Sequence, residues 1–182
     1  MLFNEKTITL KDGRTAVLRA PRPEDAAPMV QYLKDTAAET EFIMRYPEEV
    51  TMTAEQEAAF FERLAASPFD MMIVCEVEGR VAGNCQINFG NKMKTRHRAS
   101  VAIGLTKEFW NLGIGTAMFG EMIAVARARE DTRHIDLEFI EGNSRARALY
   151  EKMGFRVIAV KPDAIMLRDG SLRNEYLMRL VL

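Results

Sequence analysis

Residues 103–116 read IGLTKEFWNLGIGT, and this stretch decides the fold of the chain. An alternating pattern over residues 98–105 predicts a strand that ends here, and a one-sided apolar pattern over about 115–129 predicts a long helix that begins here. The turn between them contains Gly113 and Gly115. Glycines allow the backbone to approach a ligand, and the free N–H groups of a first helical turn attract anions such as a pyrophosphate.

The glycine turn alone is equally compatible with a simple tight turn. Two nucleotide-binding motifs, the P-loop and the Rossmann fingerprint, also contain glycines before a helix. A P-loop needs Lys-Ser or Lys-Thr after the second glycine of a longer loop, and no such pair follows Gly115. A Rossmann fingerprint needs a third glycine three residues after Gly115, where this chain has Met118. Both motifs are therefore excluded by specific residues.

Before this stretch the patterns predict a hairpin, two helices and two more strands. Apolar residues between Ala26 and Ala37 recur on one helical face, and Thr53 with Gln56 has the spacing of a capping box at a helix start. Short turns between the strands favour an antiparallel meander. The expected elements are hairpin strands over 7–10 and 15–19, helices from 23 and from 53, and strands over 71–77 and 81–89.

After the long helix the chain predicts a strand over 134–140, a short helix over 144–152 and two final strands around the turn at 168–170. The strand–helix–strand unit within 101–139 predicts a parallel pair with a right-handed crossover. The sequence therefore predicts an α/β fold with a mixed sheet. No internal repeat or linker divides the chain, so a single domain over residues 1–182 is expected.

Residues 103–116 resemble the strand–helix junction of the GNAT superfamily of N-acetyltransferases, whose cofactor motif is Gln/Arg-x-x-Gly-x-Gly/Ala. Trp110 stands where glutamine or arginine is commoner, which implies that backbone amides rather than an arginine bind most of the phosphate. Residues 143–155, NSRARALYEKMGF, resemble the second motif of the family, with Gly154 placed to end the helix. The resemblance implies a central mixed, mostly antiparallel sheet with a splayed parallel strand pair, flanked by about four helices.

The resemblance also implies acetyl-coenzyme A as co-substrate. Asn143 has an independent interpretation as a helix N-cap, which is compatible with a bond to the pantetheine arm. No metal is expected, because Cys75 and Cys85 lack Cys-x-x-Cys spacing and only His97 and His134 accompany them. The expected cofactor-binding residues are Ile103, Leu105, Leu112, Gly113, Ile114, Gly115, Thr116 and Asn143.

Tyr150 and Glu138 are the expected catalytic residues. Without the family Tyr150 would be a core aromatic, whereas in GNAT enzymes a tyrosine at this place usually donates a proton to the departing sulfur. A phenol of pKa ~10 protonates a thiolate of pKa ~8.5 only when it lies within hydrogen-bond reach. Glu138 resembles the base of ribosomal-protein N-terminal acetyltransferases, and a solvated strand carboxylate is an equal alternative. Glu141 and His97 are weaker candidates.

The predicted function is direct transfer of an acetyl group from acetyl-coenzyme A to a primary amine in a ternary complex. Transfer of another acyl group is one alternative, and a non-catalytic module that binds coenzyme A as a sensor is another. The resemblance implies that the first two helices and the loop between them, over about 35–54, form the acceptor cleft, and segment 39–49 of this loop is acidic and aromatic. That composition suits a polyamine, an aminoglycoside, another small amine or a peptide N-terminus. Homodimers are common in the family, but no residue identifies an interface.

Composition limits the remaining function classes. Hydrophobic residues make up 48% of the 182 residues, enough for a core without disulfides or metals. The net charge of −1 argues against a nucleic-acid binder driven by bulk charge. No apolar run reaches ~18 residues and the N-terminal residues lack a signal-peptide pattern, so no membrane span and a cytoplasmic location are expected.

Overall fold

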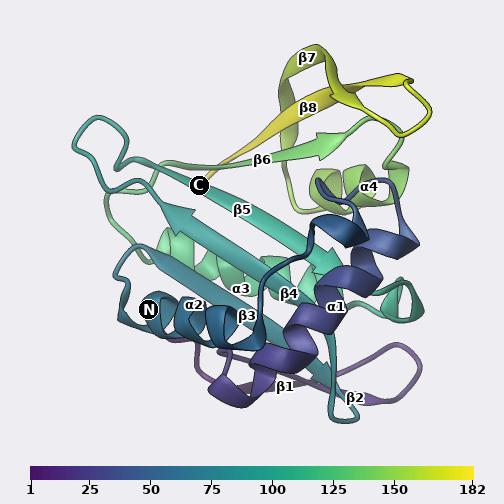
Figure 1. Cartoon of the computed structure of the whole chain (residues 1–182). Coiled ribbons are helices and arrows are strands. Elements are labelled where there is room, and N and C mark those ends of the chain that lie inside the picture. Colours follow the sequence, from purple (N-terminus) through teal and green to yellow (C-terminus); the bar gives the residue numbers. More distant parts are fainter.

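The computed structural model describes residues 1–182, which form one twisted sheet of eight strands in the order β1-β2-β3-β4-β5-β6-β8-β7 (Figure 1). Every neighbouring pair is antiparallel except β5 and β6, which confirms the predicted mixed sheet. The strands are β1 (Lys6–Thr9), β2 (Thr15–Arg19), β3 (Asp70–Val77), β4 (Arg80–Phe89), β5 (Arg98–Leu105), β6 (His134–Ile140), β7 (Arg156–Met166) and β8 (Leu172–Val181).

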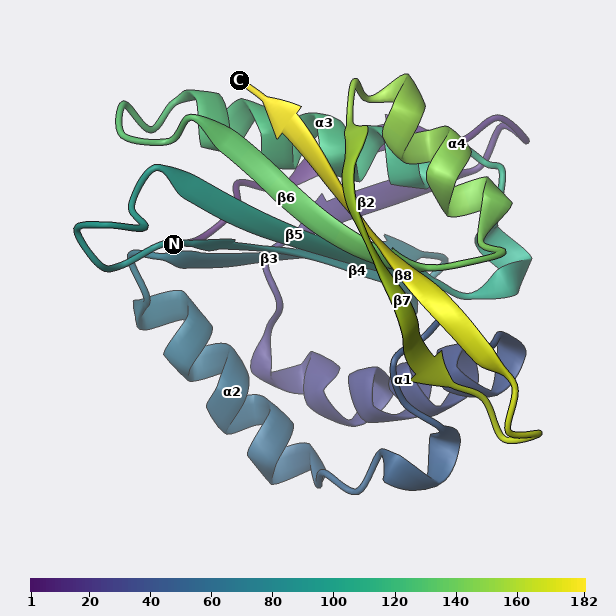
Figure 2. The ribbon, with the colours of Figure 1, turned by 90° about the horizontal axis from the view of Figure 1, so that it is seen from above.

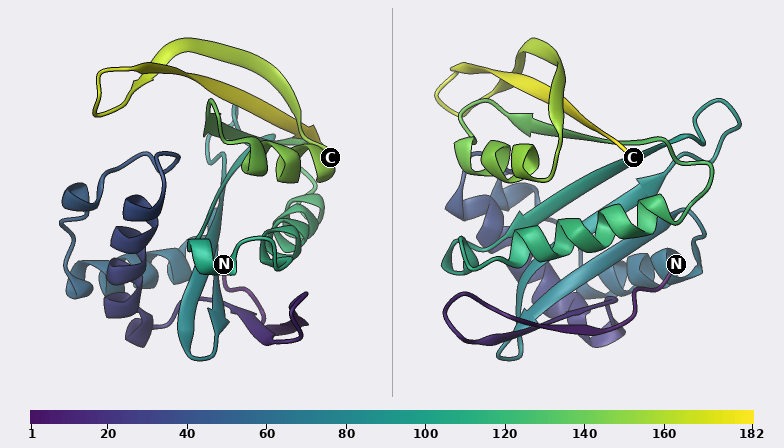
Figure 3. Two further views of the ribbon diagram at one scale, coloured as in Figure 1. Left: turned by 90° about the vertical axis from the view of Figure 1, so that its right-hand side faces the viewer. Right: turned by 180° about the vertical axis from the view of Figure 1, so that it is seen from behind.

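Four α-helices cover the two faces of the sheet. Helices α1 (Ala26–Glu39) and α2 (Ala54–Ala66) lie on one face, and α3 (Ile114–Arg127) and α4 (Ser144–Lys152) lie on the other (Figures 2 and 3). Three short 3-10 turns, η1 (Pro23–Asp25), η2 (Pro47–Glu49) and η3 (Lys107–Phe109), complete the elements. None of the helices combines the length and hydrophobicity needed to cross a lipid bilayer.

The starts of the helices follow the local signals in the sequence. The hydroxyl oxygen of Thr53 accepts a hydrogen bond from the Gln56 N–H at 3.3 Å, and the Gln56 side chain accepts one from the Thr53 N–H at 2.9 Å. This reciprocal pair satisfies two backbone donors that the helix itself leaves without partners. The capping box predicted for α2 is therefore present.

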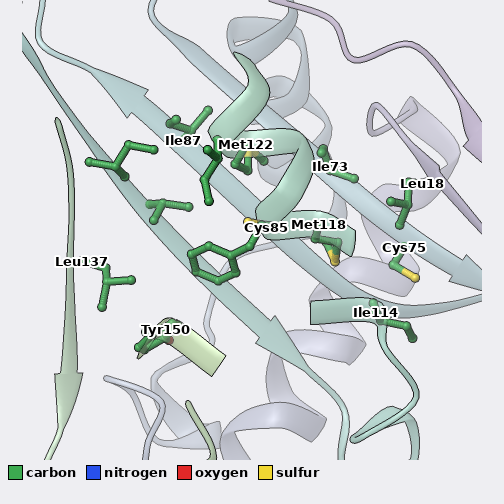
Figure 4. Close-up of a cluster of buried hydrophobic side chains, with 14 of the residues drawn as sticks. Leu18, Ile73, Cys75, Cys85, Ile87, Ile114, Met118, Met122, Leu137 and Tyr150 are labelled. Carbon is green, nitrogen blue, oxygen red and sulfur yellow. The ribbon is translucent and has the colours of Figure 1, made fainter. Parts of the chain in front are cut away.

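The larger of two cores lies between the sheet and α3 (Figure 4). Ile73, Ile87, Met118 and Met122 have no exposed surface, and they interlock the central strands with the buried face of α3. Both cysteines lie in this core as free, buried thiols. A second cluster, which includes Met29, lies beneath α1 and α2 on the other face of the sheet.

The parallel strands β5 and β6 pair over only three residues, Arg98–Ser100 opposite His134–Asp136, and then separate. Beyond that point β5 continues along β4, while β6 continues along β8. The Thr106 N–H donates to the Ala82 carbonyl of β4 at 3.1 Å, and backbone bonding alternates along a strand. The backbone groups of Ile103 and Leu105 therefore point into the gap, as the predicted splayed pair requires.

Two features of the fold differ from the sequence predictions or were not predicted: the end of α3 and the position of β8 in the sheet. Helix α3 ends at Arg127 rather than near Arg129, because Ala128 is the helix C-cap and a turn follows it. Strand β8 lies between β6 and β7, so the last strand of the chain occupies an inner position and β7 forms the exposed edge. No local pattern in the sequence predicted that order.

Candidate active site

A cleft of about 590 Å³ opens where β5 and β6 separate. It passes between the two faces of the sheet, so its lining comes from both helical layers. On the α3 and α4 side, which we call the cofactor half, the lining includes Trp110, Gly113, Gly115, Asn143, Arg145 and Tyr150. On the α1 side, which we call the acceptor half, it includes Tyr32, Thr36, Phe42, Met44, Arg45 and Asn84.

The glycine turn provides an anion site at the start of α3. Gly113 is the N-cap with φ 97°, a backbone conformation that favours glycine, and no side chain caps the helix. The N–H groups of Ile114, Gly115 and Thr116 therefore have no intrahelical partner, and these residues line the cleft. Together with the helix dipole, these free donors fit a pyrophosphate.

Gly115 brings α3 and α4 close together beside this site. A Cβ atom at this position would lie 2.9 Å from Cδ2 of Leu149, closer than ordinary van der Waals contact. Both residues line the cleft, so their close approach shapes its wall. The glycine predicted from the sequence motif therefore has a steric role in addition to its backbone donor.

The turn between β1 and β2 adds a cation to the anion site, which sequence analysis missed. The Lys11 N–H donates to the Leu112 carbonyl at 3.1 Å, and the Lys11 side chain lies beside Gly113 at the rim of the cleft. The side chain of Leu112, which is predicted to bind cofactor, packs against the larger core, and the residue is not among those that line the cleft. Its contribution is to hold Lys11 at the glycine turn.

An arginine reaches the glycine turn from α4. The Trp110 indole N–H donates to the Leu105 carbonyl at 2.8 Å, and the Arg145 guanidinium stacks directly over the indole ring. Burial lowers the pKa of Arg145 from its ordinary value, but this value is so high that the side chain stays charged. The sequence interpretation, in which Trp110 left the turn without an arginine, therefore overlooked Arg145.

Asn143 connects β6 to α4 at the cleft. Its side-chain oxygen accepts a hydrogen bond from the Ala146 N–H at 3.2 Å, which confirms the N-cap. The side-chain nitrogen donates to no protein atom, and the residue lines the cleft. One amide group therefore both begins α4 and offers a free donor to a ligand.

Tyr150 combines a buried ring with an unpartnered hydroxyl. Its ring contacts Phe119, Phe139 and Phe155 at centroid distances of 5.4, 5.9 and 6.3 Å, and Figure 4 shows it at the end of the core cluster. The residue lines the cleft, and its hydroxyl makes no hydrogen bond within the protein. Burial raises the pKa of Tyr150, so the hydroxyl keeps its proton at neutral pH.

Glu138 lines the cleft from β6, with its side chain 47% exposed. Its carboxylate accepts a hydrogen bond from Lys161 Nζ at 2.7 Å, and the same ammonium donates to the buried Glu175 at 2.8 Å. These two carboxylates raise the pKa of Lys161. The predicted base is therefore present at the cleft, but it is paired with a cation from β7.

The weaker candidates for the base lie elsewhere. Glu141 accepts hydrogen bonds from the backbone and side chain of Asn174 at 3.1 and 3.2 Å, which fixes the start of β8. The ring of His97 packs edge-on against that of His134, with centroids 5.3 Å apart, and neither Glu141 nor His97 lines the cleft. No group of three or more His, Cys, Asp or Glu side chains is arranged to hold a metal ion.

The acceptor half is closed by aromatic side chains that sequence analysis did not single out. The Tyr32 hydroxyl, from α1, donates to Oδ1 of Asn84 on β4 at 3.1 Å. Phe42 contacts the turn after β6, because a Cβ atom on Gly142 would lie 3.6 Å from its ring. These contacts join segments distant in sequence, which no local pattern predicts.

The acidic residues of segment 39–49 do not line the cleft, in contrast to the sequence interpretation. Glu39 accepts a hydrogen bond from the Lys107 N–H at 2.6 Å, and Glu49 accepts one from the Tyr46 N–H at 2.6 Å. Glu48 forms an ion pair with Arg168 from the β7–β8 turn. The carboxylates of Glu39 and Glu48 therefore contact other elements, and that of Glu49 caps η2 within the loop.

Comparisons with known proteins agree with this arrangement. A sequence model of the acetyltransferase (GNAT) domain matches residues 16–156. The L-amino acid N-acetyltransferase AaaT of Escherichia coli (strain K12) is 28% identical over 117 residues, which are 64% of this chain and 72% of that protein. The acetyltransferase of GNAT family from Streptococcus pneumoniae has a TM-score of 0.86 and 26% identity, covering 92% of this chain and 99% of that chain.

A further solved structure, yncA from Salmonella typhimurium, contains its cofactor acetyl-CoA. It has a TM-score of 0.78 at 18% identity and covers 92% of this chain and 94% of its own, a similarity that concerns the fold. The family match spans most of the sheet, the glycine turn and α4, where the cleft has its binding groups. The chain therefore belongs to the GNAT family of acetyltransferases.

Proposed function

We propose that the protein transfers an acetyl group from acetyl-coenzyme A directly to a primary amine, both bound in the cleft between β5 and β6. The observation that carries this proposal is the unpartnered Tyr150 hydroxyl in the same cleft as the free amides of α3. Acetyl-coenzyme A supplies a thioester and a thiol leaving group. A single domain is supported by the one sheet, whose strands extend from Lys6 to Val181.

The cofactor half offers groups that suit the parts of a coenzyme A molecule. The free N–H groups of the first turn of α3 would bind the pyrophosphate, with the charges of Lys11 and Arg145 beside them. The Ile103 backbone and the Leu105 N–H have no partner strand in the gap, so an extended amide chain could pair with them as a strand does, while the Leu105 carbonyl is bound by Trp110. Asn143 would donate its free side-chain N–H to the same chain.

The acetyl transfer needs a proton removed from the amine and a proton given to the leaving sulfur. An alkylammonium of pKa ~10.4 is mostly charged at neutral pH, and forming the free amine costs ~4.6 kcal/mol. Glu138 would accept this proton, directly or through water, and Tyr150 would give its own proton to the sulfur. The second proton that the nitrogen loses as the amide forms would then restore the Tyr150 hydroxyl. The Leu105 N–H would stabilise negative charge on the acyl oxygen.

The test is thiol release from acetyl-coenzyme A with a panel of amines, with products identified by mass. The panel contains L-amino acids, the substrate class in the name of the Escherichia coli relative, together with polyamines, aminoglycosides and peptides. We expect equal amounts of thiol and acetylated amine with at least one class. We also expect Glu138→Gln to lower kcat near neutral pH.

The alternative is a module that binds coenzyme A without catalysis. It would bind acetyl-coenzyme A in the same cleft but release no thiol with any class of amine. That outcome would contradict the proposed function. Propionyl-coenzyme A in the same assay would test whether another acyl group is preferred.

A further inference from the structure

Arg45 is the charged side chain that the loop between α1 and α2 contributes to the cleft. The loop residues that line the cleft are Thr40, Phe42, Ile43, Met44 and Arg45. Arg45 is half-buried and forms neither a hydrogen bond nor an ion pair with the protein. A guanidinium normally finds several acceptors when it leaves water, so its free donors in a cleft mark a place for an anion.

Neighbouring contacts hold this part of the loop in place. The guanidinium of Arg168, from the β7–β8 turn, lies 4.0 Å from the centroid of the Tyr46 ring and forms an ion pair with Glu48. On the other side, Phe42 contacts the turn at Gly142. Arg45 lies between these two residues in the chain, so the contacts of both constrain the backbone that carries it.

Glu57 is the acidic residue whose pKa the charge of Arg45 affects, but it does not pair with Arg45 in the cleft. Glu57 on α2 is 6% exposed, accepts no hydrogen bond and is not among the residues that line the cleft. Burial raises the pKa of Glu57, and the charge of Arg45 acts on it in the opposite direction. Glu57 therefore forms no hydrogen bond or ion pair that would occupy the Arg45 donors.

The charges of the cleft determine which acceptors fit. Lys11, Arg145 and Lys152 lie in the cofactor half, from the β1–β2 turn and α4, while Arg45 lies in the acceptor half. The carboxylate of the cleft, Glu138, is already paired with Lys161. A polyamine or an aminoglycoside would place several positive charges beside Arg45, which is unfavourable.

We propose that Arg45 binds a carboxylate of the acceptor, so that the acceptors are amino acids and other amines that carry a carboxylate. This inference rests on the proposed function. A guanidinium presents parallel N–H donors that match the two oxygens of a carboxylate. The acceptor's carboxylate would bind at Arg45 and its amine would face Glu138 and the thioester. Arg45 is thus a specificity-determining residue for acetyl transfer.

The test compares each common L-amino acid with its carboxamide, which keeps the amine and the side chain but removes the negative charge. For the best acceptor pair, we expect the wild-type protein to prefer the carboxylate by about 10- to 100-fold in kcat/KM, mainly through KM. Arg45→Gln should abolish this preference while leaving the affinity for acetyl-coenzyme A unchanged. Arg96→Gln, which alters an exposed arginine outside the cleft, is the matched control and should keep it.

A second readout does not depend on turnover. Calorimetric titration of the N-acetylated amino acid into the protein should show binding that Arg45→Gln weakens about 10-fold or more and Arg96→Gln does not. A wild-type protein that prefers carboxamides or polyamines, or an Arg45→Gln variant that keeps the preference for carboxylates, would overturn the inference. If no amine of any class is acetylated, the proposed function fails first and the inference fails with it.

Discussion

Three side chains at the cleft carry polar groups that the protein does not use: the Tyr150 hydroxyl, the Asn143 amide nitrogen and the Arg45 guanidinium. Polar groups that leave bulk water in folded proteins almost always find partners, so unpartnered ones beside a cleft indicate where a ligand binds. Glu138 differs from them because Lys161 already occupies its carboxylate. The first three are therefore the residues whose substitution should affect ligands more than folding.

Replacing Tyr150 with phenylalanine tests the proposed proton donor. We expect Tyr150→Phe to lower kcat about 100-fold or more, while the affinity for acetyl-coenzyme A and the melting temperature change little, because the hydroxyl has no partner in the protein. The raised pKa keeps the hydroxyl protonated throughout the neutral range, so it should add no ionisation to the rate profile there. Stopped-flow thiol release and calorimetry measure these quantities.

The control for this variant is Tyr176→Phe. The Tyr176 ring stacks on Phe139 at 5.2 Å, but the residue is not among those that line the cleft. This variant should keep the wild-type rate. An unchanged rate in Tyr150→Phe would exclude Tyr150 as the proton donor.

At the scale of elements, Gly113 at the start of α3 and Gly120 within the helix contribute differently to the protein. Gly113 begins the helix with φ 97° and leaves donors exposed to the cleft, so it needs a conformation that other residues adopt at a cost. Gly120 lies in the exposed interior of the same helix with a normal helical backbone and open space around it. The proposed cofactor site needs the conformation of Gly113, whereas Gly120 only weakens the helix.

Gly113 and Gly120 therefore predict opposite changes in stability. We expect Gly113→Ala to lower the free energy of unfolding by about 1–2 kcal/mol and to weaken acetyl-coenzyme A binding, because a side chain strains this conformation. We expect Gly120→Ala to raise it by about 0.5–1 kcal/mol without affecting binding. Urea unfolding measures both changes, and a stabilising Gly113→Ala would contradict the proposed role of the turn.

Some features of the fold could be predicted from the sequence, and others could not. The helix starts at Thr53 and Asn143 and the glycine turn at Gly113 depend on contacts within a few residues, so local patterns predicted them. The inner position of β8 and the contact between Lys11 and Gly113 join segments distant in the chain, and no local signal encodes them. Local motifs thus predicted the cofactor half of the cleft better than the acceptor half.

The sequence motifs drew attention to Tyr150, Asn143 and the glycine turn, which line the cleft, but not to Arg145 and Arg45, which line it too. Arg145 lies within residues 143–155, in the first turn of α4. Its positive charge close to a predicted phosphate site was the signal that could have indicated it. Arg45 was hidden in a segment whose overall acidity predicted the opposite charge preference. Which side chains of a loop face a cleft depends on their tertiary partners, here Arg168 and Lys107.

At the scale of the whole molecule, a buried cluster of charged side chains connects the sheet to helix α1. Arg19 on β2 donates to both oxygens of Asp25, at 2.6 and 2.7 Å, and to Glu76 on β3 at 2.7 Å. Asp25 also accepts from the Arg22 N–H at 2.7 Å and directly precedes α1. The position of α1, and with it the acceptor half of the cleft, therefore depends on this cluster.

The charge cluster predicts a dependence of stability on pH. Burial alone would raise the pKa of Asp25, but the hydrogen bonds from Arg19 and Arg22 outweigh it and lower the pKa below the ordinary value. A lowered pKa stabilises the folded state at pH values above the ordinary pKa, and this stability is lost as the pH falls through the folded value. Because removing Asp25 leaves the buried Arg19 with Glu76 as its remaining counter-charge, Asp25→Asn should lower the free energy of unfolding by about 3 kcal/mol at neutral pH.

The same variant should show a weaker loss of stability on acidification, since it no longer contains the carboxyl that titrates. Urea unfolding at neutral pH and below about pH 4 measures both effects. As a control, Asp12→Asn alters an aspartate in the exposed β1–β2 turn and should change stability far less. Equal acid sensitivity of Asp25→Asn and the wild-type protein would contradict this account of the cluster.

The central claim is that the gap between β5 and β6 is an acetyl-coenzyme A site built from the free amides of α3. Calorimetric titration of acetyl-coenzyme A into the wild-type protein tests it most directly. We predict saturable binding of one molecule per chain, with a dissociation constant in about the micromolar range typical of enzyme substrates. The absence of saturable binding up to about 1 mM acetyl-coenzyme A would contradict the claim.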